Sequence, residues 1–127
     1  MYKIVKKEVL NEQVTSLTIH APKVAKKALP GQFIIYRMNE GGERVPLTIA
    51  DYDREKGNIT IIFQGVGKST KLLANLEEGD KILDVVGPLG VATHLDGYKK
   101  VAVIGGGLGT AIAYPQAKYL YHHGAEV

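Results

Sequence analysis

The sequence predicts a mainly β fold, in which a small antiparallel Greek-key barrel is followed by one strand–helix unit. Two observations indicate this fold. Short apolar runs separated by turn residues recur from residue 2 to residue 86, with one helical pattern among them, as in small closed β folds. Over residues 100–124 the pattern changes to an apolar run, a glycine cluster and apolar residues at helical spacing. We therefore expect a β-barrel domain over residues 1–98 and the beginning of a second domain over residues 99–127.

The composition excludes several classes of protein. The chain has 127 residues, of which 45% are hydrophobic and 23% charged, as is usual for one soluble domain with a core. No apolar run approaches the roughly 20 residues of a membrane helix. Without cysteine the chain offers neither a disulfide nor a thiolate metal ligand, and its histidines are not spaced as a metal site. The net charge of +3 comes from scattered lysines, which argues against a nucleic-acid partner. We expect a cytoplasmic protein.

The first half of the chain contains five predicted strands. In order, they are Tyr2–Leu10, Val14–His20, Gln32–Met38, Arg44–Tyr52 and Ile59–Gln64. Residues 21–31 read as a loop with exposed lysines. Pro46 cannot donate a hydrogen bond within a sheet, so the fourth strand should lie at an edge or carry a bulge. In the fifth strand Ile59, Ile61 and Phe63 alternate with other residues and should share one buried face.

A short helix and a sixth strand complete the predicted barrel. Ser69 can cap a helix whose apolar side is Leu72, Leu73 and Leu76 and which ends at Gly79. The strand Asp80–Val86 follows, and the residues Gly87-Pro88-Leu89-Gly90 should break it sharply. Residues 91–99 then connect the barrel to the last unit.

The last unit has the order of a nucleotide-binding unit. Val101–Ile104 reads as a strand buried on both faces, and glycines follow at 105, 106, 107 and 109. Free N–H groups at such a turn can receive a phosphate. Thr110 stands where a third motif glycine would be, so a plain βα unit that uses glycine for close packing is the alternative. Because Pro115 lacks an N–H group, regular helix should begin no earlier than about Ile112.

Two further stretches could bind an anion. The stretch Gly65–Thr70 looks like a phosphate loop, but Ile62 occupies the place of the first glycine, so an NTPase is rejected. The start of the short helix can still bind an anion through Ser69 and Thr70, or it is an ordinary capping turn. Arg44 and Thr48 place a cation and a hydroxyl on one strand, and the alternative is a surface arginine beside a strand threonine.

Taken in order, these motifs resemble one family. They are Pro30-Gly31-Gln32-Phe33, Val45-Pro46-Leu47-Thr48, Gly67-Lys68-Ser69-Thr70, Gly87-Pro88-Leu89-Gly90 and Gly105–Ala111 with Pro115. The sequence is similar to the ferredoxin–NADP reductase-like flavoproteins, in which an FAD-binding barrel precedes a pyridine-nucleotide domain. The stretch Glu43–Asp51 most resembles the small electron-transfer subunits of that family. The fold expectation is thus a ferredoxin reductase-like FAD-binding domain followed by the first βα unit of a Rossmann-like domain.

The resemblance implies a role for each matched position. Thr48 would be the catalytic residue, with its hydroxyl near the reactive nitrogen of the flavin. Pro46 and Leu47 would shape the ring pocket, Ile62, Phe63 and Gln64 would line the ribityl and adenine side, and Ser69 and Thr70 would hold the pyrophosphate. The other implied cofactor contacts are Arg44, whose guanidinium would take a phosphate, and Val45, Gly67 and Lys68. Gly106, Gly107, Gly109 and Thr110 would receive the nicotinamide dinucleotide. The family's arginine position is occupied by Val45, and a shift of one residue in a strand reverses the face, which weakens the role of Arg44.

The resemblance also implies cofactors and partners. FAD and NAD(P)H are expected as cofactors, and a [2Fe–2S] cluster only in a later segment or in a partner. The expected partner is a larger iron–sulfur or flavoprotein subunit, or ferredoxin, with neither nucleic acid nor membrane involved. The exposed apolar side of the last unit would favour a homo-oligomer. We expect the chain to be part of a longer protein and inactive alone with NAD(P)H. The alternative is a non-catalytic β-barrel module that binds a partner protein and no flavin.

Overall fold

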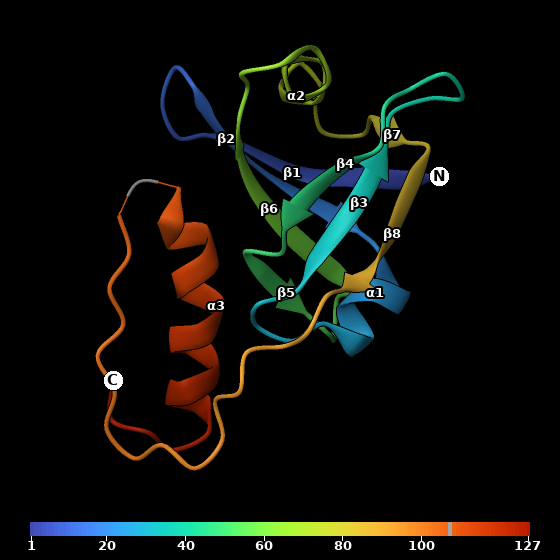
Figure 1. Cartoon of the computed structure of the whole chain (residues 1–127). Coiled ribbons are helices and arrows are strands. Elements are labelled where there is room, and N and C mark those ends of the chain that lie inside the picture. Colours follow the sequence, from blue (N-terminus) through green and yellow to red (C-terminus); the bar gives the residue numbers. More distant parts are fainter. Residues whose placement is uncertain (107) are drawn as a thin grey trace.

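The computed structural model describes the whole chain except Gly107, and for Gly109 and Thr110 it describes the backbone only. The elements are β1 (Tyr2–Val9), β2 (Val14–His20), α1 (Pro22–Lys27), β3 (Phe33–Arg37), β4 (Val45–Thr48), β5 (Asp51–Asp53), β6 (Asn58–Gln64), α2 (Lys68–Ala74), β7 (Lys81–Ile82), β8 (Asp84–Leu89) and α3 (Gly109–His122). We call residues 2–90 the β body. Figure 1 shows α2 over one end of the β body, α1 at the opposite end and α3 alongside it.

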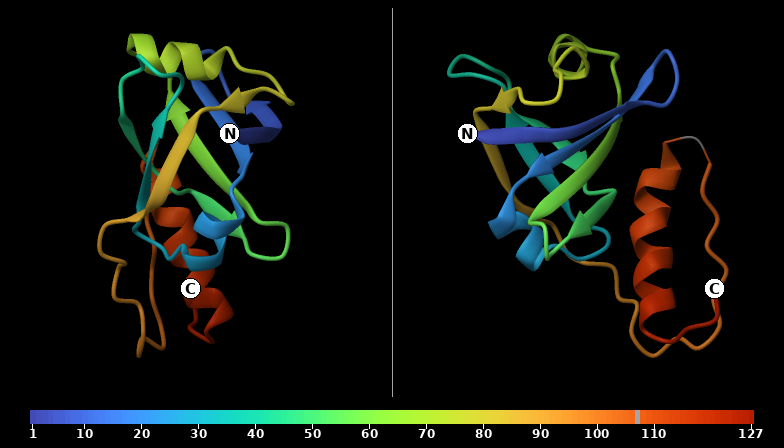
Figure 2. Two further views of the ribbon diagram at one scale, coloured as in Figure 1. Left: turned by 90° about the vertical axis from the view of Figure 1, so that its right-hand side faces the viewer. Right: turned by 180° about the vertical axis from the view of Figure 1, so that it is seen from behind.

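The strands form two antiparallel sheets. One has five strands in the order β5-β6-β2-β1-β7, and the other has three in the order β4-β3-β8. The predicted mainly β, antiparallel fold is therefore confirmed. Over the described residues the hydrogen-bonded ladders do not close into one ring, so the expected closed barrel is in fact two sheets packed around one core. Figure 2 shows this packing from the side and from behind.

Alternating apolar residues build the core between the sheets. On β6, Ile59, Ile61 and Phe63 are no more than 2% exposed, as their period of two predicts. Leu17 and Ile19 of β2 lie opposite Ile61 and Ile59 and are also fully buried. Burying a side chain of this size contributes about 1.5–3 kcal/mol to the free energy of unfolding, which makes β2 and β6 the centre of the fold.

The predicted fourth strand switches from one sheet to the other. Up to Ile49 its N–H groups bond to the small sheet, since Ile49 N donates to Gln32 O at 3.1 Å. The next residue, Ala50, donates to Thr60 O of β6 at 2.8 Å. The single strand expected over residues 44–52 is therefore two strands, β4 and β5. Pro46 lies in β4 at the edge of the small sheet, as predicted.

Two local predictions in the β body were wrong. Residues 22–27, expected to be loop, form the helix α1, because Val24 and Ala25 are buried on one side of a turn that begins at Pro22. The strand β8 does not break at Gly87 but continues to Leu89. It is an edge strand, where a proline is tolerated, and the strand needs glycine at position 87 because a Cβ there would lie 2.9 Å from Ile34 Cγ2.

The last unit differs most from its prediction. Val101–Ile104 is not a strand, and Ile104 is 93% exposed. A parallel strand needs neighbouring strands, and the described part of the chain offers this segment only one parallel bridge, between Lys100 and Glu126. The helix α3 begins at Gly109, three residues earlier than expected, and carries Pro115 in its interior. No helix within the described residues is long and apolar enough to cross a membrane.

Candidate functional site

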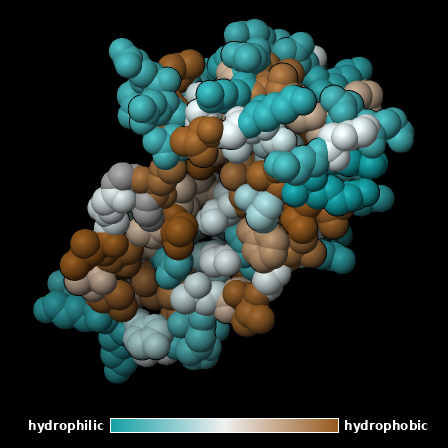
Figure 3. Space-filling view, turned by 45° about the horizontal axis from the view of Figure 1, so that its top comes forward, coloured by the Kyte–Doolittle hydropathy of each residue, from teal (hydrophilic) through white to brown (hydrophobic). Residues whose placement is uncertain are grey.

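A groove of about 400 Å³ opens where β4 passes β6. Its walls come from β4, from β6, from the start of α2 and from the first turn of α3. The lining residues are Val45, Pro46, Leu47, Thr48, Ile62, Phe63, Gln64, Val66, Thr70, Leu108, Ala111 and Ile112. Most are apolar, with few polar groups, as in sites for small ligands and cofactors. We call residues 91–127 the C-terminal lobe. Figure 3 shows apolar surface on both sides of the junction between the β body and this lobe.

The edge strand β4 gives the groove unpaired backbone groups. In an antiparallel pair, alternate residues point their N–H and C=O groups toward the partner strand. Ile49 points toward β3, so the backbone groups of Thr48 and Pro46 point toward the open edge. Pro46 needs no N–H group there. Thr48 therefore offers the groove a backbone donor as well as its hydroxyl.

The two faces of β4 both border the groove. Val45 and Leu47 lie opposite Tyr36 and Ile34, which are fully buried, so they face the core side. Pro46 and Thr48 face the other way, and Thr48 is half-buried. The strand thus brings an apolar wall and a hydroxyl to one place.

The structure brings eight of the predicted site residues together. They are Val45, Pro46, Leu47, Thr48, Ile62, Phe63, Gln64 and Thr70. Within this set the side chain of Phe63 belongs to the core, at 2% exposure. The side-chain amide of Gln64 donates to Gln13 Oε1 at 2.9 Å, and this bond restricts the rotation of the Gln64 side chain.

The residues predicted at a pyrophosphate divide between two places. Thr70 lines the groove, and its Oγ1 accepts hydrogen bonds from the N–H groups of Val66 at 3.1 Å and Gly67 at 3.0 Å. Lys68 and Ser69 line a neighbouring cavity of about 310 Å³. There Ser69 donates its hydroxyl to Glu43 Oε1 at 3.1 Å. Gly67, and not Ser69, is the N-cap of α2.

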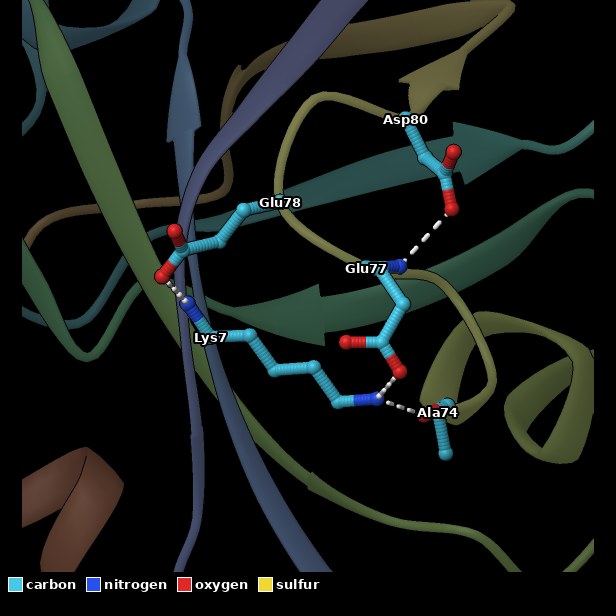
Figure 4. A network of polar contacts seen from close by, with 5 residues as sticks. All are labelled: Lys7, Ala74, Glu77, Glu78 and Asp80. Carbon is cyan, nitrogen blue, oxygen red and sulfur yellow. Dashed lines mark hydrogen bonds and ion pairs between the residues drawn. The ribbon is translucent and has the colours of Figure 1, made fainter.

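The short helix α2 is fixed from its other end by a lysine of β1 (Figure 4). Lys7 Nζ donates to Ala74 O at 2.8 Å and to Glu77 Oε1 at 3.1 Å. The first of these bonds satisfies a carbonyl that the end of a helix leaves unpaired. Because Lys7 is part of the five-stranded sheet, these bonds tie the end of α2 to that sheet.

The remaining predicted residues lie elsewhere. Arg44 precedes β4, is exposed and is not among the residues that line the groove. Gly106 is exposed in the loop before α3, and Gly109 is the first residue of that helix. Gly107 and the side chain of Thr110 lie outside the described residues. The predicted open loop over residues 106–111 is therefore partly helix.

Sequence reasoning missed four residues of the groove. Val66, Leu108, Ala111 and Ile112 line it. Val66 and Ile112 are 70% and 50% exposed, and apolar residues exposed near a cavity are the signal that identifies them. Nothing in the local sequence shows that the first turn of α3 faces β4.

One buried tyrosine lies next to this site, opposite Val45. Tyr36 of β3 is fully buried, and within the described residues its hydroxyl has no hydrogen-bond partner. Burial, and secondly the negative charge of Glu43, raise the pKa of Tyr36 to about 12. The side chain is therefore neutral at physiological pH.

Sequence relatives span the whole chain. No family model matches it. It is 47% identical to the dihydroorotate dehydrogenase B electron transfer subunit homolog of Thermotoga maritima, a match that covers 98% of the chain and 44% of that protein. It is 53% identical to a Clostridium beijerinckii protein encoded in the 3′ region of adh, covering 100% of the chain and 45% of that protein.

A solved structure of the NADH-dependent reduced ferredoxin-NADP oxidoreductase, studied for flavin-based electron bifurcation, superposes with a TM-score of 0.93 at 46% identity. The match covers 98% of this chain and 45% of that one. The chain thus spans a little under half the length of the relatives named here.

Fold and sequence together place the chain among the ferredoxin reductase-like proteins. Within that class it is related to the electron-transfer subunits of dihydroorotate dehydrogenase B, for example that of Geobacillus thermodenitrificans at 33% identity. The resemblance read from the motifs is confirmed at both levels.

Proposed function

We propose that the chain is the FAD-binding part of an NAD(P)H-dependent flavin oxidoreductase or electron-transfer subunit. The complete protein would pass electrons between NAD(P)H, FAD and an iron–sulfur partner such as ferredoxin. The observation that carries the proposal is the groove, because eight residues that the sequence alone assigned to FAD line one cavity. The names of the related electron-transfer subunits support it.

The residues present fit a flavin. The groove is open and mainly apolar, with the free edge of β4 along one side. A planar ring system can lie against Pro46 while its polar rim meets the backbone groups at the open edge of β4 beside Thr48. At about 400 Å³ the groove suits the ring system rather than a whole dinucleotide, so the pyrophosphate would extend toward α2.

Each group of the chain then has a definite task. The Thr48 hydroxyl would hydrogen-bond the reactive edge of the ring, and the walls formed by Leu47, Ile62 and Ile112 would exclude water. Ser69, Lys68 and Thr70 would bind the pyrophosphate, for which Ser69 must exchange Glu43 for a phosphate oxygen. Bound FAD would supply the redox chemistry, which is the exchange of a hydride for single electrons.

We propose that the remaining redox tasks are divided between residues 99–127, a later segment and a partner protein. We propose that residues 1–98 form the FAD-binding domain and that residues 99–127 open a nucleotide-binding domain in which Gly106, Gly107, Gly109 and Thr110 approach NAD(P)H. A [2Fe–2S] cluster would lie in a later segment or a partner, since this sequence has no cysteine. We further propose a cytoplasmic location, a larger iron–sulfur or flavoprotein subunit as partner, and self-association of this chain through the exposed apolar side of α3.

The visible absorption spectrum tests the proposal. The purified chain should be yellow, or should develop a structured flavin band near 450 nm when titrated with FAD. Ile62→Trp should fill the groove and abolish the titration. Val86→Trp on β8, where Val86 is 48% exposed and outside the groove, should bind FAD normally. A wild-type chain that stays colourless with excess FAD would overturn the proposal and favour the alternative of a partner-binding module.

A further inference from the structure

The junction between α3 and the β body contains an ion pair that the flavin site does not account for. Lys118 Nζ donates to Asp51 Oδ1 at 2.6 Å, and the two side chains are 33% and 34% exposed. Asp51 begins β5, and Lys118 lies in the second half of α3. Among the described residues, it is the one side-chain hydrogen bond that joins α3 to a strand. We call it the Asp51–Lys118 pair.

The surroundings of the pair favour its charged form. The ring of Tyr52 lies 5.7 Å from Lys118 Nζ, within the range of a cation–π contact. Burial acts to lower the pKa of Lys118, but the hydrogen bond and the charge of Asp51 outweigh it and raise that pKa. The Lys118 ammonium is thus charged throughout the physiological range, and the pair is less exposed to water than a surface pair, whose contribution is usually small.

The pair lies on the same face of α3 as the wall of the groove. Ala111, Pro115 and Lys118 are spaced four and three residues apart, so they form one stripe along the helix. Ala111 is 5% exposed and Pro115 is fully buried. The stripe therefore runs from the groove, at Ala111, to Asp51. A helix rises about 1.5 Å per residue, so Lys118 lies about 10 Å along the axis from Ala111, and an anchor at that distance helps to set where the first turn lies.

We propose that Asp51 and Lys118 are positioning residues for the flavin groove, because they hold α3 so that Leu108, Ala111 and Ile112 close its fourth wall. The inference rests on the proposed function and adds a specific coupling between the β body and the helix. Neither side chain is among the residues that line the groove, so both would act through the position of α3.

The test compares two matched aspartate variants of the full chain. Asp51→Asn breaks the Asp51–Lys118 pair. Asp84→Asn breaks an ion pair of equal length, 2.6 Å to Arg37, between β3 and β8, where Asp84 is 39% exposed. We expect Asp51→Asn to weaken FAD binding by about threefold to tenfold and to increase quenching of the bound flavin by iodide. Asp84→Asn should lower the thermal midpoint without exposing the flavin. Lys118→Arg, which keeps the charge, should retain most of the affinity.

Hydrogen exchange without FAD provides a readout that is independent of binding. Amides of residues 112–122 should exchange faster in Asp51→Asn than in Asp84→Asn, while those of β2 and β6 exchange alike. If the wild type binds no FAD, the proposed function fails and the positioning role fails with it. If the wild type binds FAD but Asp51→Asn matches it in affinity, quenching and exchange, only the positioning role is overturned.

Discussion

At the scale of single residues, the proposed catalytic role is confined to one hydroxyl. Thr48 is the residue of β4 that combines a side-chain hydroxyl, half-burial and a position on the open edge of the strand. Arg44, which has the most obvious functional chemistry in the sequence, is exposed outside the groove. The position of a residue relative to the groove therefore limits its role as much as its chemistry does.

Removing the hydroxyl of Thr48 should weaken the flavin site without unfolding it. Thr48→Val keeps the shape of the side chain but removes a hydrogen bond of about 0.5–1.5 kcal/mol. We expect FAD affinity to fall by roughly twofold to tenfold, and flavin reduction in the complete protein to slow further. Thr48→Ser should retain both properties. Fluorescence titration and stopped-flow reduction measure them, and a valine variant as active as the wild type would contradict the role.

Tyr36 should make stability depend on alkaline pH. Its pKa in the folded state is about 12, against 10.0 for the free side chain. A group whose pKa is raised by folding stabilises the fold fully below its unfolded pKa, so this contribution should be lost between about pH 10 and pH 12. It amounts to at most about 2–3 kcal/mol.

Urea unfolding at pH 9 and pH 11 measures this effect, and Tyr36→Phe is the control. The phenylalanine variant should be as stable as the wild type at pH 7, or up to about 1 kcal/mol more stable, because it removes a buried hydroxyl that has no partner among the described residues. It should also lose less stability between pH 9 and pH 11. Parallel losses in both proteins would show that other groups cause the pH dependence.

At the scale of elements, the strands that show a regular alternation of apolar residues were predicted from the sequence. The strands β1, β2, β3 and β6 and the burial of Ile59, Ile61 and Phe63 follow from alternation. The split between β4 and β5 was missed, because Ile49 and Ala50 continue the apolar pattern while the chain changes sheets. The helix α1 was missed because six residues are too few to show a helical period.

The candidate site was predictable where it depends on motif order and not where it depends on packing. The motifs on β4, β6 and α2 were found from the sequence, and the fold brings them together. The first turn of α3 was missed as a wall, because its place beside β4 depends on packing between residues far apart in the sequence; the contact of Lys118 with Asp51 is one between such residues. The strand expected at residues 101–104 failed for a similar reason, since its formation depends on neighbouring strands.

The turn at Gly31 should fix the path by which the chain leaves the β body. Gly31 has φ +95°, and a Cβ there would lie 2.4 Å from Thr93 Oγ1 and 2.9 Å from Thr93 N. Gly31→Ala should therefore cost about 1–3 kcal/mol for the backbone conformation and more for the clash. Gly79→Ala is the matched control, because φ is +93° there and no atom of the described part of the chain lies within 4 Å of the added Cβ. Equal losses in chemical unfolding would show that contact with Thr93 has no role.

At the scale of the whole molecule, the β body and α3 differ in how fully their apolar residues are buried, and they share one site. The β body has a continuous core, whereas α3 leaves Ile112, Tyr114 and Tyr121 between 48% and 70% exposed. A segment with few buried apolar contacts opens at a lower free energy than the core does. The groove nevertheless takes walls from both lobes, so a ligand bound there has contacts that neither lobe completes alone.

This arrangement predicts that FAD changes the cooperativity of unfolding as well as its midpoint. Without FAD, the helical signal in far-ultraviolet circular dichroism should decline at a lower temperature than the β-sheet band in the infrared amide I region, because α3 separates before the core opens. A ligand present at 100 times its dissociation constant stabilises the state that binds it by about 2.7 kcal/mol. Because the binding state needs α3 in place, FAD should raise both transitions and bring them together. AMP, which lacks the ring system, should not merge them. Coincident transitions in the absence of FAD would show that α3 and the β body already unfold as one unit.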